Sequence, residues 1–190
     1  MKYLIEEQNC NPSCLDENGN TPLHHASING SLDAVKYLIL EKNCDPTARR
    51  KSDSSTPIHL ASLNGHLEVV RFFISELNCN PNITGRHDET PLHSAASHGH
   101  LHIVKYLIEE QNCNLSCKDE DDDTPLHAAS RNGHLDVVKY LVLEKNCNPR
   151  VHRKIDSNTP VELALFNGHM EVVRFFISKF NRYPKFPRKY

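Results

Sequence analysis

The sequence predicts an all-α protein, a solenoid of stacked antiparallel helix pairs with projecting hairpin loops. A Thr-Pro dipeptide occurs five times, and the steps between successive threonines are 35, 34, 34 and 35 residues. A glycine follows nine residues after each of these threonines, and an Asn-Cys dipeptide keeps nearly the same period. A fixed period of this length is typical of arrays in which each repeat buries its apolar face against its neighbours.

The first helix of each repeat is expected to start at the Thr-Pro dipeptide. A threonine hydroxyl can accept a hydrogen bond from a free N–H of the first turn, and proline suits the first helical position. In the first full repeat this helix should run to about Asn29, where Gly30 stops it. The capping threonines are Thr21, Thr56, Thr90, Thr124 and Thr159.

A second helix is predicted from Leu32 to about Lys42, because apolar residues recur there at spacings of three, four and seven. Asn43 should end it, since asparagine tolerates the left-handed backbone of a helix C-terminus. One additional residue recurs near this end in every copy, and we expect it to lengthen the second helix by part of a turn.

The blocks TPLHHA, TPIHLA, TPLHSA and TPLHAA, two of them followed by NGHLEVV or NGHLDVV, resemble the ankyrin-repeat family. The resemblance covers five repeats and a leading half repeat. It implies an L-shaped stack of helix pairs and a role in protein–protein recognition. It also implies that the block histidines, His24, His59, His93 and His127, hydrogen-bond backbone groups and tie neighbouring repeats together. The last block reads TPVE, so Glu162 replaces that histidine.

The repeats predict three segments. Residues 1–15 should hold the second helix of a truncated leading repeat, residues 16–178 the five repeats, and residues 179–190 a basic, aromatic tail. Several stretches recur with an offset of 103 residues, such as KYLIEEQNCN at 2–11 and 105–114, which indicates a duplication of three repeats. With this offset Met1 takes the place of Val104, so the chain begins inside a second helix, and we expect a piece of a longer array or a truncated gene product.

A partner is expected to bind the loops before each block and the concave face of the first helices. The loops alternate in charge, from mildly acidic through basic and mixed to strongly acidic and basic again. Either these charges select a partner, or they are solvated and attract neighbouring loops weakly. The predicted loop contacts are Glu17, Asn20, Arg50, Ser52, Ser55, Arg86, His87, Glu89, Glu120, Asp121 and Asp123. The predicted contacts on the first helices are His25, Ile28, Leu60, Leu63, Ser94, Ser97, Ala128 and Arg131.

Composition argues against several other classes of protein. The net charge of −2 predicts no general attraction to nucleic acid, and no apolar run is long enough to span a membrane. Seven cysteines, an odd number, with no signal peptide favour reduced thiols in the cytoplasm. No nucleophile stands beside a base in a non-repeating context, so we expect a monomeric, non-catalytic protein without a cofactor.

Two alternatives to a binding module remain open. Three histidines alternate at His98, His100 and His102, and Cys10 with Cys14, like Cys113 with Cys117, forms a CxxxC pair. These residues would serve a metal- or redox-responsive protein, although solvated turn histidines and buried thiols are the simpler interpretation. The other alternative is a structural spacer within a longer ankyrin-repeat chain.

Overall fold

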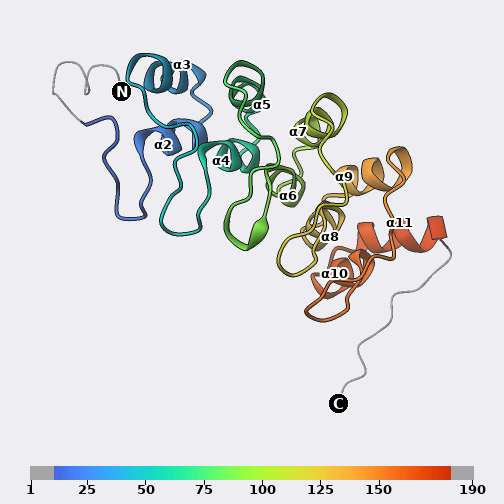
Figure 1. Cartoon of the computed structure of the whole chain (residues 1–190). Coiled ribbons are helices and arrows are strands. Elements are labelled where there is room, and N and C mark those ends of the chain that lie inside the picture. Colours follow the sequence, from blue (N-terminus) through green and yellow to red (C-terminus); the bar gives the residue numbers. More distant parts are fainter. Residues whose placement is uncertain (1–10, 181–190) are drawn as a thin grey trace. The chain divides into compact units, whose positions relative to one another are not determined.

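The computed structural model describes residues 11–180, and the chain forms two compact units, residues 1–94 and residues 95–190. Between residues 11 and 180 the regular elements are all helical, with no strand. The predicted fold class, repeated helix pairs that pack in sequence order, is confirmed. Figure 1 shows each pair as two short helices joined by a tight turn, with a long loop leading to the next pair.

Unit 1 contains two complete helix pairs. Helix α2 (Pro22–Ile28) pairs with α3 (Leu32–Lys36), and α4 (Pro57–Leu63) pairs with α5 (Leu67–Arg71). The first helices α2 and α4 pack on each other, and so do the second helices α3 and α5. A 3₁₀ turn, η3 (Arg86–Asp88), lies in the last loop of this unit.

Unit 2 repeats the same arrangement. Its helices are α7 (Leu101–Lys105), α8 (Pro125–Arg131), α9 (Leu135–Lys139), α10 (Pro160–Phe166) and α11 (Met170–Phe180), while α6 (Pro91–Ser97) spans the division between the units. Helix α8 packs on α10, and α9 contacts both α7 and α11. Each packed helix contributes a buried apolar residue at every turn, such as Leu126 on α8 and Val138 on α9.

The first helices begin as predicted. Thr21 caps α2 through its side-chain oxygen, which accepts from the backbone N–H of His24, while the His24 ring accepts from the backbone N–H of Thr21. The same reciprocal capping box occurs at Thr56, Thr124 and Thr159, with a proline next in each case. In the last of these, Glu162 takes the place of the histidine.

The second helices end differently from the prediction. Four of them change after one α-helical turn into a five-residue π-helix: η1 (Tyr37–Glu41), η2 (Phe72–Glu76), η4 (Tyr106–Glu110) and η5 (Tyr140–Glu144). The wider π turn takes up the additional residue of each repeat, whereas the sequence predicts a second helix that is longer by part of a turn. Asn43 then adopts φ 53°, the left-handed conformation predicted for it.

Two predicted boundaries need correction. Residues 11–15 form a turn, with a hydrogen bond from the Cys14 N–H to the Asn11 carbonyl, and are not helical. Helix α11 continues to Phe180, so the first two residues of the proposed tail belong to the last repeat. The remainder of the leading helix (residues 1–10) and of the basic tail (residues 181–190) lies outside the described residues.

Candidate functional site

The block histidines link each first helix to the loop that follows it. In His24, His59 and His127, Nδ1 accepts from the N–H of the capping threonine. The opposite ring nitrogen, Nε2, lies 3.0–3.1 Å from a carbonyl oxygen of the next loop, in Ala48, Glu89 and Val151 respectively. Because one nitrogen accepts and the other donates, the arrangement requires a neutral imidazole protonated at Nε2. His93 makes the same contact with the N–H of Thr90.

Burial holds these imidazoles in the neutral form. Desolvation lowers the pKa of His59 and of His127 to about 4, and it also lowers the pKa of His24. Hydrogen bonds to backbone carbonyls oppose this shift but do not outweigh it. The role that the resemblance implied for these histidines, a bond to backbone groups of the next repeat, is therefore what their geometry provides.

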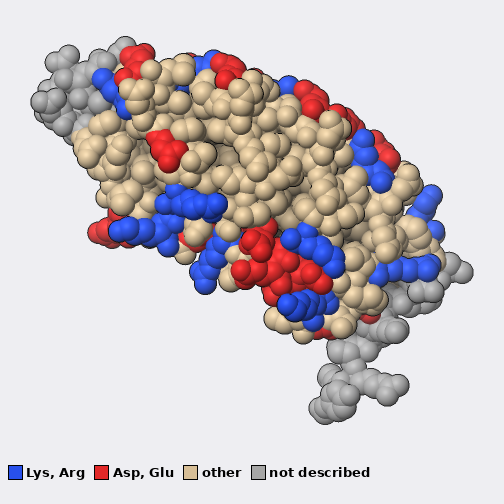
Figure 2. Space-filling model, viewed as in Figure 1, with Lys and Arg blue, Asp and Glu red and all other residues tan. Residues whose placement is uncertain are grey.

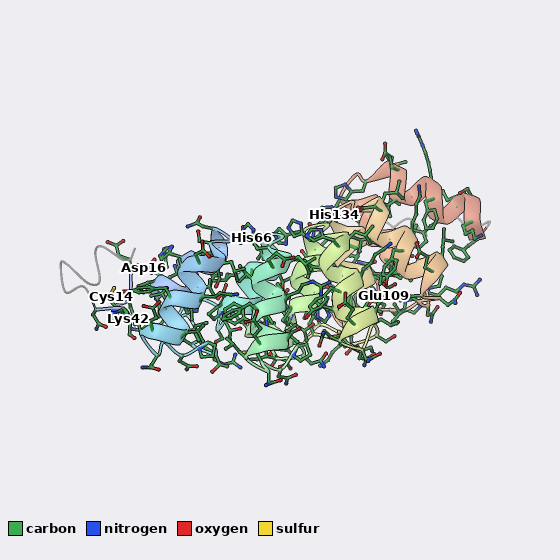
Figure 3. The ribbon with its side chains drawn as sticks, turned by 90° about the horizontal axis from the view of Figure 1, so that it is seen from above. Cys14, Asp16, Lys42, His66, Glu109 and His134 are labelled. Carbon is green, nitrogen blue, oxygen red and sulfur yellow. The ribbon has the colours of Figure 1, made fainter. Side chains whose placement is uncertain are left out.

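A second set of histidines, in the turn between the two helices of a repeat, was missed by the sequence analysis. In unit 1, Nε2 of His66, which is labelled in Figure 3, lies 2.8 Å from the carbonyl oxygen of Ile28 in the preceding repeat. In unit 2, Nε2 of His134 lies 2.9 Å from that of Ser97. Each ring also covers a glycine of the preceding repeat, and the Asn-Gly-His triplets at these turns were the signal that could have revealed the contact.

Each loop before a block is closed by its own backbone hydrogen bonds. The closing bonds run from the N–H of the first to the carbonyl of the last residue in loop 1 (residues 16–20), loop 2 (50–55), loop 3 (85–89), loop 4 (119–123) and loop 5 (153–158). Two residues before the capping threonine the backbone is left-handed in every loop, at Gly19, Ser54, Asp88, Asp122 and Ser157. The loops are therefore defined hairpins, not loose connections.

In loop 1 this position requires a glycine, because its backbone is left-handed and also lies close against loop 2. An added Cβ on Gly19 would lie 2.8 Å from the backbone nitrogen of Lys51 in loop 2, far inside van der Waals contact. Neighbouring loops therefore pack closely in unit 1. In the same unit, the N–H of Arg86 donates to the carbonyl of Asp53, which joins loop 2 to loop 3 at 2.9 Å.

The opposite charges of loops 4 and 5 largely satisfy each other. Arg153, whose side chain is 11% exposed, lies 3.3 Å from a carboxylate oxygen of Asp121 and 3.4 Å from one of Asp123. Asp123 also pairs with Arg131 on α8, and the Lys154 N–H donates to the Asp121 carbonyl at 2.7 Å. Figure 2 shows acidic side chains gathered in one patch with basic side chains beside them. The acidic run therefore serves in part to hold loops 4 and 5 together. This is the simpler of the two interpretations of the loop charges, attraction between neighbouring loops.

Loop 2 contains a similar internal pair. The Arg50 guanidinium binds the carboxylate of Asp53 in a two-pronged contact. Burial disfavours the ionised Asp53, but hydrogen bonds from Arg50 and Ser55 outweigh it and lower the pKa of this carboxyl to about 2. Arg50, a predicted partner contact, is thus already engaged within its own loop.

The predicted partner contacts differ in accessibility. Exposed positions are Glu17, His25, Ser52, Arg86, His87, Glu89, Glu120 and Asp121, and half-buried ones are Ile28, Arg50, Ser55, Leu63, Ser97 and Arg131. Five predicted contacts are buried and offer almost no surface: Asn20, Leu60, Ser94, Asp123 and Ala128. For these five the expectation of a partner contact is corrected. Leu60, Ser94 and Ala128 are buried on the first helices, the Asn20 side chain donates to Asp16 within loop 1, and Asp123 pairs with Arg131 and Arg153.

One exposed loop residue was overlooked. Ile155 lies four residues before Thr159, the position held by Glu17, Ser52, Arg86 and Glu120 in the other loops. Its side chain is 66% exposed, the largest value among the exposed large apolar residues of the described chain. The five residues four positions before the capping threonines, which we call the loop tips, are all exposed and differ in chemistry. The alternating charges of the loops give no indication of this apolar tip, and its exposure is visible only in the structure.

Within residues 11–180 the thiols and the histidine triplet are not arranged as a metal site. Cys44, Cys113 and Cys147 are buried, and desolvation raises the pKa of Cys113 and of Cys147 to about 11. The rings of His98 and His100 stack with centroids 6.5 Å apart. Within residues 11–180 no three His, Cys, Asp or Glu side chains are grouped so that they could hold a metal ion. Cys10 lies outside that range.

Repeated helix pairs, joined by two sets of histidines and carrying hairpin loops with exposed tips, define a repeat protein of the ankyrin type. The chain belongs to the ankyrin-repeat family: a family model described as ankyrin repeats in three copies matches residues 1–85, 38–119 and 77–153. Members of this family are generally protein-interaction modules and typically not enzymes. The comparison with curated proteins found no match. None of the helices in residues 11–180 has the length and apolar character needed to cross a lipid bilayer.

Proposed function

We propose that this chain is a non-catalytic module that binds another protein through its loop tips, supported by the half-buried concave face of its first helices. The observation that carries the proposal is the contrast between the tips and their supports. The tip side chains Glu17, Ser52, Arg86, Glu120 and Ile155 are exposed and include acidic, polar, basic and apolar types, while the loop backbones below them are closed by hydrogen bonds. A preordered surface loses little conformational entropy when it binds.

The acidic loop offers a partner less accessible charge than its sequence suggests. Because Asp123 is buried and Asp121 pairs with Arg153, only part of the acidic run can face a partner. Ile155 supplies an apolar anchor beside it, and exposed apolar side chains at an interface centre contribute more to affinity than rim charges do. Recognition in unit 2 should therefore depend on Ile155 at least as much as on Glu120.

The buried thiols suit a reducing compartment, so we place this activity in the cytoplasm, with the chain acting as a monomer.

The test compares two variants of the full chain with the native protein. The tip variant replaces Glu17, Arg86, Glu120 and Ile155 by serine. The control variant replaces an exposed set of the same charges on the second helices, namely Glu68, Lys139, Glu144 and Leu143, by serine. Each immobilised chain captures proteins from lysate, and a captured protein is then purified and titrated.

The tip variant should bind the purified partner at least tenfold more weakly, and the control variant should bind like the native chain. Equal affinity of all three chains would show that the tips do not carry recognition. If neither the native chain nor the control variant captures a protein above background, the proposal fails. The structural-spacer alternative then gains support.

A further inference from the structure

Ser52, the tip of loop 2, directly follows three basic residues. The stretch reads RRKS, so Arg49 and Arg50 lie three and two residues before the serine. No other serine or threonine of the sequence follows two arginines at this spacing. An exposed hydroxyl with this pattern of charge before it is a candidate for covalent modification.

The Ser52 hydroxyl is accessible and unengaged. The residue is exposed, and its hydroxyl has no hydrogen-bond partner among the residues that the structure describes. The other two serines of the loop are half-buried and already in use. The Ser54 N–H donates to the Arg50 carbonyl, and the Ser55 side chain hydrogen-bonds the Asp53 carboxylate. Ser52 is therefore the reactive hydroxyl of this loop.

Loop 2 can open without exposing the core, because none of residues 49–55 is buried. Opening releases Arg50 from Asp53, and it releases Arg49 from the carbonyl oxygens of Ser54 and Thr84. Small exposed segments with few buried contacts open at a low free-energy cost. The same local opening thus extends the chain around the hydroxyl and frees both arginine side chains for a second protein.

Loop 5 is a natural comparison for this site. Residues 152–158 read HRKIDSN where residues 49–55 read RRKSDSS, at the offset of 103 residues. The same backbone bond closes both hairpins, from Arg50 to Ser55 at 3.0 Å and from Arg153 to Asn158 at 3.1 Å. Ile155 takes the position of Ser52, so one type of hairpin presents a hydroxyl at its tip in loop 2 and an apolar side chain in loop 5.

We propose that Ser52 is phosphorylated by a basophilic serine/threonine kinase, one whose peptide groove pairs carboxylates with arginines two and three residues before the acceptor. The Ser52 Oγ attacks the γ-phosphorus of ATP, and the bond from that phosphorus to the bridging oxygen breaks. ADP leaves, and a base of the kinase takes the hydroxyl proton. The inference does not require a partner at the loop tips, so it and the proposed function can fail separately.

Phosphorylation would reverse the character of this loop. Residues 49–55 hold three basic side chains and one acidic side chain, a net charge of +2. A phosphoserine carries about −1.5 to −2 charges at pH 7, so the modified loop would be close to neutral, with its negative charge at the tip. The hydrogen bond that closes the hairpin joins Arg50 to Ser55 through the backbone and does not involve the modified side chain.

The test incubates the folded full chain with magnesium–ATP and, as the probe, the catalytic subunit of cyclic-AMP-dependent protein kinase, a basophilic enzyme. Peptide mass spectrometry should find one phosphate on Ser52, and Ser52→Ala should abolish it. Arg49→Gln with Arg50→Gln should slow the transfer at least tenfold, whereas Lys51→Gln, the matched control at the neighbouring basic residue, should slow it far less. A native chain without phosphate on Ser52, or equal rates in the three proteins, would overturn the proposal.

Loop 5 provides a gain-of-function test in the same chain. His152→Arg with Ile155→Ser gives this hairpin the acceptor and the two arginines of loop 2, and it should gain a second phosphate at position 155. Ile155→Ser alone lacks the arginine three residues before the acceptor, so its modification at that position should be at least tenfold slower. Equal modification of the two variants, or no gain in the double variant, would contradict the role given to the paired arginines.

Discussion

Nε2 of His59 lies 3.1 Å from the carbonyl oxygen of Glu89, thirty residues further along the chain, while Nδ1 of the same ring accepts the N–H of Thr56. A single neutral imidazole thus joins a helix start to the next loop. Protonation of Nδ1 would remove the acceptor, so the link depends on pH.

Stability should fall as the pH drops from 7.5 to 5. The folded-state pKa of His59 and of His127 is about 4, below the unfolded value of 6.5, so between these values only the unfolded chain takes up the proton. At pH 5 each histidine should cost about 2 kcal/mol of unfolding free energy. Urea unfolding at both pH values measures this loss. It should shrink in a His59→Gln, His127→Gln double variant, and an equal loss in the variant would assign the effect to other groups.

Arg153→Met should destabilise the protein by roughly 2 kcal/mol or more, because it removes one of the two arginines that pair with the nearly buried Asp123 carboxylate. Arg150→Met is the matched control, since Arg150 is exposed on the same loop segment, and it should change the unfolding free energy by less than about 0.5 kcal/mol. Equal effects in urea unfolding would show that the ion pairs between loops 4 and 5 add nothing specific.

Gly99→Ala should be more damaging than Gly168→Ala. Both glycines have a left-handed backbone, with φ +75° and φ +78°, so both changes carry a backbone penalty of about 1 kcal/mol. At Gly99 the new methyl group also displaces His134 and breaks its bond to Ser97, which should add at least about 1 kcal/mol. Thermal unfolding of the two variants compares them directly, and equal melting temperatures would argue against the turn-histidine contact.

The cysteines should differ strongly in reactivity. Cys14 is exposed, whereas Cys113 and Cys147 are buried with pKa values near 11, and the thiolate is the reactive form. A short pulse of iodoacetamide at pH 8, followed by peptide mass spectrometry, should label Cys14 first and leave Cys113 and Cys147 largely unmodified. In urea all three should react at similar rates, and equal labelling of the native protein would contradict their burial.

The sequence predicted the ends of the first helices well because those ends depend on local chemistry. Thr21 with Pro22 starts a helix by itself, and Asn43 stops one by its backbone preference. The π turns were not foreseen, since an additional residue can extend a helix or widen it, and tertiary packing decides between the two. The burial of Leu60 and Ala128 was also missed, because variation between repeats does not reveal which side of a short helix faces its neighbour.

The loops illustrate the same limit. The alternating signs were visible, but not that Arg153 reaches two carboxylates across the neighbouring loop while Ile155 projects from the tip. Which charges remain available to a partner depends on distances between loops, and these distances arise only when the repeats stack.

Because a backbone hydrogen bond between the first and last residues closes every hairpin, that closure does not depend on which side chain stands at the tip. Glutamate, serine, arginine and isoleucine all occupy this position on the same backbone. Natural variation or a designed library can therefore exchange the five tip side chains independently of one another and of the helices below. Such exchanges would alter what the protein recognises and leave its fold unchanged.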